Sequence, residues 1–405
     1  MSAQDPADLE STSSSSRLSF ISDPSIRYAA VIFVASRLFF TLWALVILAF
    51  RPQPQEPDEL LRPYLDQPRF VEGLTGALLG PWQRFDTLHY LRIAEAAYQH
   101  EEDSVFPPLY PALMSGASYL MSPILPPAEG SLLAGIMISN ISFFGALVLL
   151  YRLTQKELSD QIAKRTIVLF AIFPTSFFLL AAYSESLFIL LAVGSIYSAR
   201  GGRFLLAGIL ALLASLTRLT GAVLILPLVF EYFSQRNFNL KQIDWSALAL
   251  LLPVLGTAAF MAWRSWSGLP PLSHIYESYW FQKTGFPGVD LVWSLVKIVQ
   301  GEAAFTLYFD FFCALLLIGT TVTAFKILGT TYGLYSLSLL LFILLPTSEL
   351  KPLYSFSRYA LAFFPMFMIL GNRISTPWRR RAILYPSIAL LLYFSGQFFM
   401  WGWVA

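Results

Sequence analysis

The chain has few charged residues and a single cysteine. Charged side chains make up 13% of its 405 residues, about half of the roughly 25% found in soluble domains. So few charges cannot cover a water-exposed surface, and a soluble globular protein is therefore excluded. Cys313 lies in an apolar stretch, so the chain forms no internal disulfide and no cysteine-based zinc site. We interpret it as a small buried hydrophobic residue.

Hydrophobic residues, in contrast, are abundant at 56% of the chain. They occur in blocks of about 17–23 residues, the length at which a helix crosses a hydrocarbon core. The pattern predicts an all-α polytopic membrane protein with one transmembrane domain over residues 27–405. Residues 1–26 are polar and serine-rich, which predicts a disordered cytoplasmic tail rather than a signal peptide. A net charge of +2 without a basic stripe argues against a nucleic-acid partner.

The apolar blocks give the predicted spans. The first covers 27–50, and the others lie at about 132–152, 166–182, 184–199, 203–219, 221–234, 245–262, 303–325, 329–346, 357–372 and 382–402. Lysine and arginine gather in the connections at 152–165, 200–203, 236–241, 326 and 373–381. The positive-inside rule places these connections in the cytoplasm. The large loops 51–107 and 263–300 are then exoplasmic.

The apolar block at 108–124 decides the number of crossings. It has only about 17 residues, at the short limit for a span, and prolines mark both of its ends. A full crossing here would contradict the charge pattern of the later loops. We therefore predict a juxtamembrane helix in the first exoplasmic loop and about eleven transmembrane helices in all.

Residues 83–98 carry the polar pattern that points most directly to chemistry. On a helical wheel, Leu88, Arg92 and Glu95 share the face expected to meet water, whereas Asp86 and His89 lie on the opposite side. The simplest explanation for Asp86 is an N-cap, and the alternative is a chemical role. His89 could be an ordinary interfacial histidine, and residues 100–103 are expected to form a solvated loop.

Other polar residues fall at predicted exoplasmic helix ends. Glu185 occupies a hairpin tip, which is an ordinary place for a carboxylate, and Arg218 and Arg358 could simply reach the membrane interface. Arg37 lies inside the first span, where we expect a structural pairing within the bundle.

Several motifs resemble the GPI mannosyltransferase 2 family of C-type membrane glycosyltransferases, which add the second mannose in glycosylphosphatidylinositol assembly. The first is RFDTLHYLRIAE at 84–95 with FPPLYP at 106–111, and the second is FPTS at 173–176 with AYSESLF at 182–188. RLTG at 218–221 and SRYALAFFP at 357–365 resemble later signatures. Phe85 stands where the family usually has Trp, and the cysteine-containing loops of eukaryotic members are absent, as in a compact bacterial-type member.

The resemblance implies mannose transfer from dolichyl- or polyprenyl-phosphate mannose to a glycolipid on the luminal or exoplasmic face. Such a reaction needs a base for the acceptor hydroxyl and cations for the leaving phosphate. Asp86 is the candidate base, and His89 could orient it or hydrogen-bond a sugar hydroxyl. Arg358 and Arg218 are the candidate donor-phosphate ligands. Glu185, Tyr183 and Tyr90 are candidates for binding the acceptor.

The remaining expectations follow from the same resemblance. No metal ligand set is assigned, although Glu185 could bind a divalent cation. The family leaves room for an accessory membrane subunit, and the location is the endoplasmic reticulum in a eukaryote or the plasma membrane in a bacterium. The alternatives are a bacterial polyprenyl-phosphate-sugar transferase acting on cell-envelope glycans or glycolipids and, from another class, a secondary transporter or lipid flippase.

Overall fold

A computed structural model describes residues 23–52 and 62–404, and its secondary structure there is helical apart from two short strands. The α-helices are α2 (Pro24–Phe50), α3 (Gly73–Leu78), α4 (Asp86–Ala96), α5 (Leu109–Met121), α6 (Pro127–Glu157), α7 (Asp160–Ala171), α8 (Glu185–Arg200), α9 (Phe204–Thr217), α10 (Ile225–Ser234), α11 (Leu252–Trp266), α12 (Leu272–Trp280), α13 (Val289–Gln300), α14 (Phe305–Ile327), α15 (Thr330–Ile343), α16 (Phe356–Tyr359), α17 (Phe364–Arg373) and α18 (Pro377–Phe399). The all-α prediction is confirmed.

Short 3₁₀ helices and the two strands complete the fold. The 3₁₀ helices are η1 (Gly80–Trp82), η2 (Glu101–Val105), η3 (Ser176–Leu179), η4 (Leu219–Leu224), η5 (Leu240–Gln242), η6 (Trp245–Leu251) and η7 (Ala360–Ala362). Strands β1 (Lys283–Thr284) and β2 (Pro346–Thr347) pair antiparallel, with Lys283 opposite Thr347. This pairing ties the second large loop to the segment that follows α15.

Five helices in the described part of the chain are long and apolar enough to cross a membrane: α2, α6, the continuous η6–α11 helix, α14 and α18. Three shorter apolar helices are α9, η4–α10 and α15. The protein is therefore a multi-pass integral membrane protein. Helix α5 has 13 residues and is about 20 Å long; that the block at 108–124 does not span the bilayer stays a prediction.

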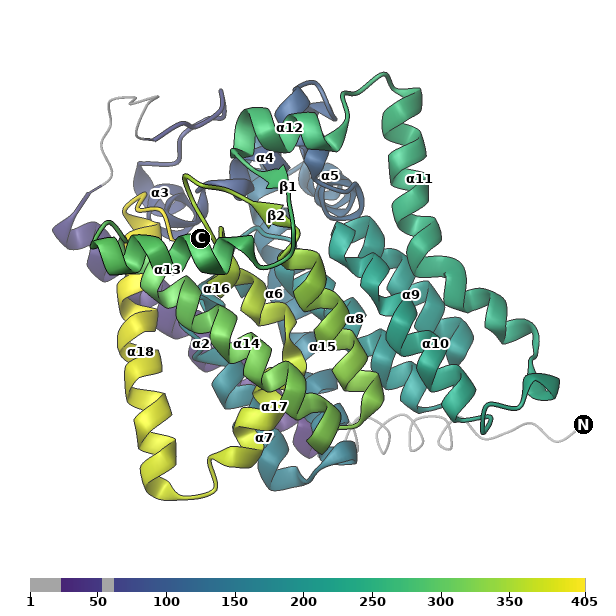
Figure 1. The fold of residues 1–405 in the computed structure, drawn as a ribbon. Helices are drawn as coiled ribbons and strands as arrows, with labels where there is room; N and C mark the ends of the chain where they lie inside the picture. Colours follow the sequence, from purple (N-terminus) through teal and green to yellow (C-terminus); the bar gives the residue numbers. More distant parts are fainter. Residues whose placement is uncertain (1–22, 53–61, 405) are drawn as a thin grey trace, which may run out of the picture.

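The two ends of helix α8 define the two ends of the molecule. Glu185 begins the helix and Arg200 ends it, about 22 Å away at 1.5 Å per residue. Arg200 forms ion pairs with Glu157 of α6 and Glu231 of α10. We call this the basic end, because the connections that the positive-inside rule assigns to the cytoplasm gather there (Figure 1).

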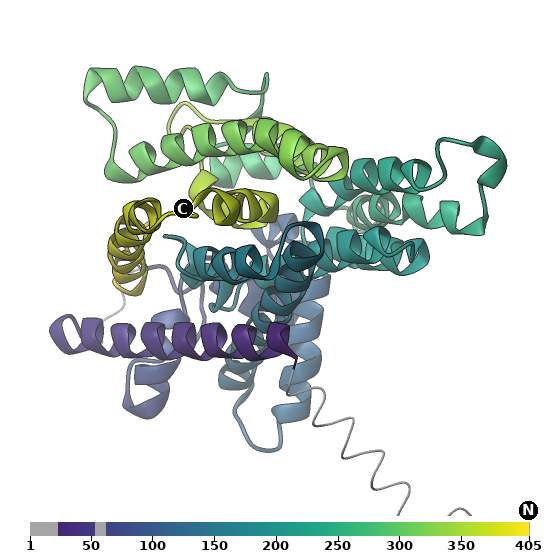
Figure 2. The ribbon, with the colours of Figure 1, turned by 90° about the horizontal axis from the view of Figure 1, so that it is seen from below.

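The opposite end, which we call the site end, carries the elements of both large loops. Helices α3, α4, α12 and α13 and the β1–β2 pair all lie there (Figure 1). Viewed from the basic end, α2 and α6 lie on one side of the bundle, α13 and α14 on another, and α9, α10 and α11 project to a third (Figure 2). The two large loops therefore meet over one end of the bundle, as their predicted common exoplasmic location requires.

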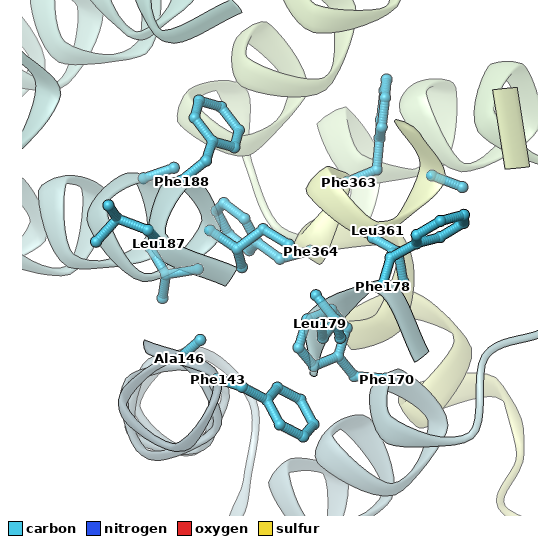
Figure 3. Packing of buried hydrophobic residues seen from close by; sticks show 14 of the residues in the cluster. Phe143, Ala146, Phe170, Phe178, Leu179, Leu187, Phe188, Leu361, Phe363 and Phe364 are labelled. Atoms are coloured by element: carbon cyan, nitrogen blue, oxygen red, sulfur yellow. The ribbon is translucent and has the colours of Figure 1, made fainter. Parts of the chain in front are cut away.

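A phenylalanine-rich core lies directly beneath the site end. Phe143 of α6 and Phe170 of α7 point toward one another, and Leu179 lies beside them (Figure 3). Phe364 lies toward Leu187 and Phe188 of α8, whereas Phe178 lies near Leu361 (Figure 3), and all of these side chains are buried. Such close packing leaves the residues at the top of the core little freedom to move.

Two sequence-based boundaries need correction. The predicted span at 166–182 is a helix only to Ala171, because Pro174 lacks an N–H and restricts the preceding residue. The predicted span at 357–372 is likewise broken between η7 and α17. Of the predicted tail at 1–26, residues 1–22 lie outside the described residues, while residues 24–26 already belong to α2, capped by Asp23.

The irregular segment after α7 is tolerated inside the bundle because side chains donate hydrogen bonds to its backbone carbonyls. Asn140 donates to the Leu180 carbonyl (3.1 Å), Ser186 to that of Leu179 (2.6 Å), and Ser139 to that of Tyr183 (2.8 Å). A non-helical backbone at membrane depth needs such internal partners, because lipid offers none.

The arrangement of the two ends predicts a labelling pattern. In a Cys313→Ala background, a cysteine at Ser278, exposed on α12, should react with a membrane-impermeant thiol reagent from the exoplasmic side. A cysteine at Gln242, exposed at the basic end, should react only after permeabilisation. Labelling of Gln242→Cys in sealed, correctly oriented membranes would reverse the assignment of the two ends.

Candidate active site

Helix α4 begins at a strained residue enclosed by aromatic rings. Phe85, just before the helix, has φ 49° and ψ −119°, an unfavourable conformation for a residue with a side chain. Its ring contacts the rings of Phe398, Trp401 and Trp403, with centroids 6.0, 5.6 and 5.2 Å away. Phe85 thus anchors the C-terminal end of the chain to the start of α4, where Asp86 is the first helical residue.

Four charged side chains from distant parts of the chain form a buried network. Arg358 Nη2 contacts Asp86 Oδ2 at 2.6 Å, and its Nε donates to Glu185 Oε1 at 2.5 Å. Arg218 Nη1 donates to the same Glu185 oxygen at 2.5 Å. All four side chains are at most 18% exposed. We call Asp86, Arg358, Glu185 and Arg218 the charged network.

The network is extended by hydroxyl groups and aromatic rings. Tyr90 donates to Ser184 Oγ at 2.7 Å, and Arg218 Nη1 also reaches Ser184 Oγ, at 3.3 Å. The Arg358 guanidinium lies over the rings of Tyr183 (4.6 Å) and Phe178 (5.1 Å). Burial raises the pKa of Tyr90 well above its ordinary value, so its hydroxyl remains a hydrogen-bond donor.

A cavity of about 360 Å³ opens beside the network. Asp86, Arg218 and Arg358 form part of its wall, and Ser184, Thr217 and Thr220 add hydroxyl groups. Aromatic residues complete the lining: Phe106, Tyr276, Trp280, Tyr354, Tyr359 and Trp403. Charged groups, hydroxyls and aromatic faces together suit a sugar carrying a phosphate.

His89 does not join the charged network, and its predicted role as the orienting partner of Asp86 has no support in the geometry. Its Nδ1 lies 2.6 Å from Asp103 Oδ1, and its ring stacks on Phe106. Arg92 contacts both oxygens of Asp103, at 2.8 and 2.7 Å. Of the predicted wet face, Leu88 and Arg92 are buried, Arg92 against η2, so the prediction is wrong for these two residues, whereas Glu95 is exposed as expected.

The loop at 100–103 is correspondingly more ordered than expected. Asp103 is fully buried, and Glu102 forms an ion pair with Arg92 at 2.7 Å. Burial by itself raises the pKa of Asp103, but the hydrogen bonds from His89 and Arg92 outweigh it and leave that pKa below its ordinary value. This cluster is a structural anchor that holds α4 against η2.

The other cations near the site have separate partners. Arg264 donates to the backbone carbonyls of Ser104 and Pro270, which ties α11 to both large loops. Arg37 stacks on Trp82 at 5.0 Å, and its Nη1 has no hydrogen-bond partner within residues 23–52 and 62–404. Stacking on Trp82 therefore takes the place of the structural pairing expected for Arg37.

Sequence reasoning missed three residues that shape the site. Ser184 joins Tyr90 to Arg218, Asp310 accepts the N–H of Ser357 at 2.7 Å, and Asp290 bonds two amides of the segment that follows β2. Asp310 could have been found, because a carboxylate inside an apolar helix needs a buried partner. No cluster of three or more potential metal ligands occurs in the described part of the chain.

Comparison with known proteins identifies the family of the chain. The profile of the family described as Mannosyltransferase (PIG-V) matches residues 26–256, more than half of the chain. The chain belongs to this family. The matched region includes Asp86, Glu185 and Arg218 of the charged network, while Arg358 lies beyond it.

Curated relatives extend the match to named proteins. The chain is 31% identical over 240 residues to GPI alpha-1,6-mannosyltransferase 2 of Rattus norvegicus, covering 57% of this chain and 46% of the relative. It is 29% identical over 205 residues to that of Homo sapiens, covering 50% and 41%. For GPI mannosyltransferase 2 of Yarrowia lipolytica the identity is 24% over 210 residues, covering 52% and 53%. The matches thus span about half the length of these relatives.

A solved structure shares the fold of this PIG-V family member. ArnT from Cupriavidus metallidurans bound to undecaprenyl phosphate superposes with a TM-score of 0.50 and 12% identity, covering 92% of this chain and 76% of ArnT. The predicted C-type glycosyltransferase fold is confirmed at this level. The roles assigned to Asp86, His89, Arg358, Arg218, Glu185, Tyr183 and Tyr90 remain predictions.

The charged network predicts a large loss of stability in Glu185→Ala. Removing this carboxylate leaves two buried guanidiniums without their shared partner, a change that typically costs about 3–5 kcal/mol. Thermal unfolding of the purified protein in detergent should show a clearly lower Tm. Glu277→Ala removes an exposed partner of Lys283 and should leave the Tm nearly unchanged. Equal effects of the two substitutions would show that the network contributes no stability.

The Asp103 anchor predicts a specific pH dependence. Because its folded pKa is depressed, its contribution is complete above the unfolded pKa of about 3.9 and is lost as pH falls through the folded pKa. The difference in Tm between wild type and Asp103→Asn should shrink as the pH falls from about 5 toward 3. A difference that grows on acidification would contradict the depressed pKa.

Proposed function

We propose that the protein transfers mannose from a lipid-phosphate donor, dolichyl- or polyprenyl-phosphate mannose, to a glycolipid acceptor on the exoplasmic or luminal face. The observation that carries the proposal is that Asp86, Arg218 and Arg358 of the charged network lie in the wall of the 360 Å³ cavity, in a chain of the mannosyltransferase family. Both large loops border this cavity, so donor and acceptor would meet at one membrane face.

The proposed topology has eleven crossings, with the N-terminus in the cytoplasm. Besides the five long helices, it uses α7 with the irregular segment after it, α8, α9, η4–α10, α15 and the broken segment α16–α17. These shorter segments are buried among neighbours, where irregular backbone is tolerated. Loops 51–107 and 263–300 are then both exoplasmic, within one transmembrane domain over 27–405.

The proposed reaction is a single displacement at the anomeric carbon. The acceptor hydroxyl oxygen bonds to that carbon, its proton passes to the Asp86 carboxylate, and the bond to the donor phosphate oxygen breaks. The lipid phosphate leaves with the electron pair. A β-linked donor would give an α-mannoside, because attack occurs opposite the leaving group.

The ion pair between Asp86 and Arg358 fits this role, since it fixes the direction of the carboxylate before substrate binds. Each guanidinium of the network has N–H donors beyond its carboxylate contacts, and we assign these in Arg358 and Arg218 to the donor phosphate. Glu185 sets the spacing of the two arginines. Tyr90, which lines the cavity and donates to Ser184, is proposed to contact the acceptor, and Tyr183 and Glu185, which do not line the cavity, are proposed to support the acceptor site through Arg358.

The identity of the acceptor is proposed from the names of the relatives. The matched relatives are named for GPI assembly, so the second mannose of a GPI precursor in the endoplasmic reticulum is the proposed product in a eukaryote. A cell-envelope glycan or glycolipid at the plasma membrane is the bacterial counterpart. An accessory membrane subunit and a divalent cation at Glu185 belong to the same proposal.

A secondary transporter fits the geometry less well. Transporter sites lie near the bilayer midplane on broken helices, whereas the charged network lies at the N-terminal end of α8, about 22 Å from the basic end. A cavity bordered by two loops at one membrane face suits an enzyme that transfers a group between two lipid-linked substrates at that face.

The proposed function is tested by Asp86→Asn in a membrane assay with radiolabelled polyprenyl-phosphate mannose and a panel of glycolipid acceptors. Loss of the base should lower the transfer rate by about 10²–10⁴-fold, measured per amount of folded protein. The control Glu277→Gln removes an exposed carboxylate at the same end of the molecule and should keep the wild-type rate. More than about half of the activity remaining in Asp86→Asn would exclude Asp86 as the base.

A further inference from the structure

The charges of the network cancel one another, which raises the question of what balances the donor phosphate. Asp86 and Glu185 carry two negative charges, and Arg358 and Arg218 carry two positive ones, all in direct contact. A lipid phosphate adds at least one more negative charge, and a second develops as the sugar departs. Under the proposed function, on which this inference rests, the site needs a further cation.

Lys351 is a cation near the cavity whose charge is not neutralised. Within the described residues it forms no ion pair with a carboxylate, whereas Lys283 pairs with Glu277. The Lys351 ammonium lies 4.7 Å from the ring centre of Trp403 and 5.4 Å from that of Tyr354. Both rings line the cavity, so the ammonium is held at its edge by aromatic faces.

The segment that carries Lys351 is fixed by a buried carboxylate. Asp290, at the start of α13 and only 4% exposed, accepts the N–H of Ser348 at 3.1 Å and that of Leu353 at 3.0 Å. The Lys351 N–H in turn donates to Ser348 Oγ at 3.2 Å. Leu353 has a positive φ of 55°, a conformation that persists only where neighbours enforce it. Lys351 is therefore presented by a pre-formed turn.

An apolar surface adjoins the lysine on the outside of the turn. Leu350 is 70% exposed, and Lys297 of α13 donates to its carbonyl at 3.1 Å. On α13 itself, Val292 and Val299 are 63% and 79% exposed. A cation at the border between an apolar surface and an aromatic cavity suits a phosphate attached to a long hydrocarbon chain.

We propose that Lys351, presented by the turn that Asp290 holds, binds the phosphate group of the polyprenyl-phosphate donor and of the lipid phosphate released from it. In this arrangement the phosphate lies between Lys351 and the charged network. The sugar occupies the aromatic and hydroxyl-lined cavity, and the hydrocarbon chain leaves along α13. Arg358 and Arg218 then contribute hydrogen bonds, while Lys351 contributes the balancing charge.

The test measures binding of sugar-free polyprenyl phosphate to the purified full chain in nanodiscs, so that no transfer reaction is needed. Lys351→Ala should raise the Kd for polyprenyl phosphate about tenfold, as expected for losing a charge-assisted contact. Lys351→Arg should restore affinity to within about twofold of wild type, because it keeps the charge and the ring contacts. Lys326→Ala removes an exposed lysine at the opposite end and should change nothing.

A parallel titration with the uncharged polyprenol separates the phosphate from the chain. Polyprenol should bind wild type and Lys351→Ala equally. An unchanged Kd for polyprenyl phosphate in Lys351→Ala, or equal weakening for polyprenol, would overturn the assignment even if the protein transfers mannose. Lys351-dependent phosphate binding without transfer to any acceptor would support the assignment and reject the proposed function.

Discussion

The charged network depends on one carboxylate oxygen. Glu185 Oε1 accepts hydrogen bonds from both Arg218 and Arg358, and Arg358 in turn holds Asp86. Two guanidiniums can approach this closely in a buried place only because a shared negative charge lies between them. The contact joins α4, α8, the end of α9 and α16, which are separated by up to about 270 residues in the chain. Removing it would therefore disturb the whole wall of the cavity.

Buried aspartates hold the segments around this network in place. Asp103 binds His89 and Arg92 and thereby fixes η2 against α4, and Asp290 binds the turn before α16. Asp310 accepts the N–H of Ser357, whose carbonyl accepts a hydrogen bond from Thr175. Both the N–H and the carbonyl of Ser357, the residue before Arg358, are thus hydrogen-bonded. Loops with little regular secondary structure become rigid because carboxylates accept hydrogen bonds from their backbone N–H groups.

The same principle explains the broken helices beneath the site. The segment between α7 and α8 leaves its helical path at the FPTS motif, and serine and asparagine side chains of α6 and α8 bond its carbonyls. This irregular path brings Ser184 to Tyr90 of α4 and Glu185 to Arg218 and Arg358. In a membrane protein such a departure is stable only inside a closely packed bundle. The local sequence and the surrounding core therefore act together to place the site.

The sequence alone determined the class of the protein, its apolar blocks, the two ends and the motif residues at one of them, because hydrophobic length and loop charge act locally. It also singled out Asp86, Glu185, Arg218 and Arg358. Only the tertiary structure decided their partners, since contacts across 33 to 272 residues depend on how helices pack. Hence His89 contacts Asp103 rather than Asp86, Arg92 is buried, and Lys351 has no carboxylate partner among residues 23–52 and 62–404. Hydrophobic patterning sets which segments are buried, whereas the geometry of packing sets which charges meet.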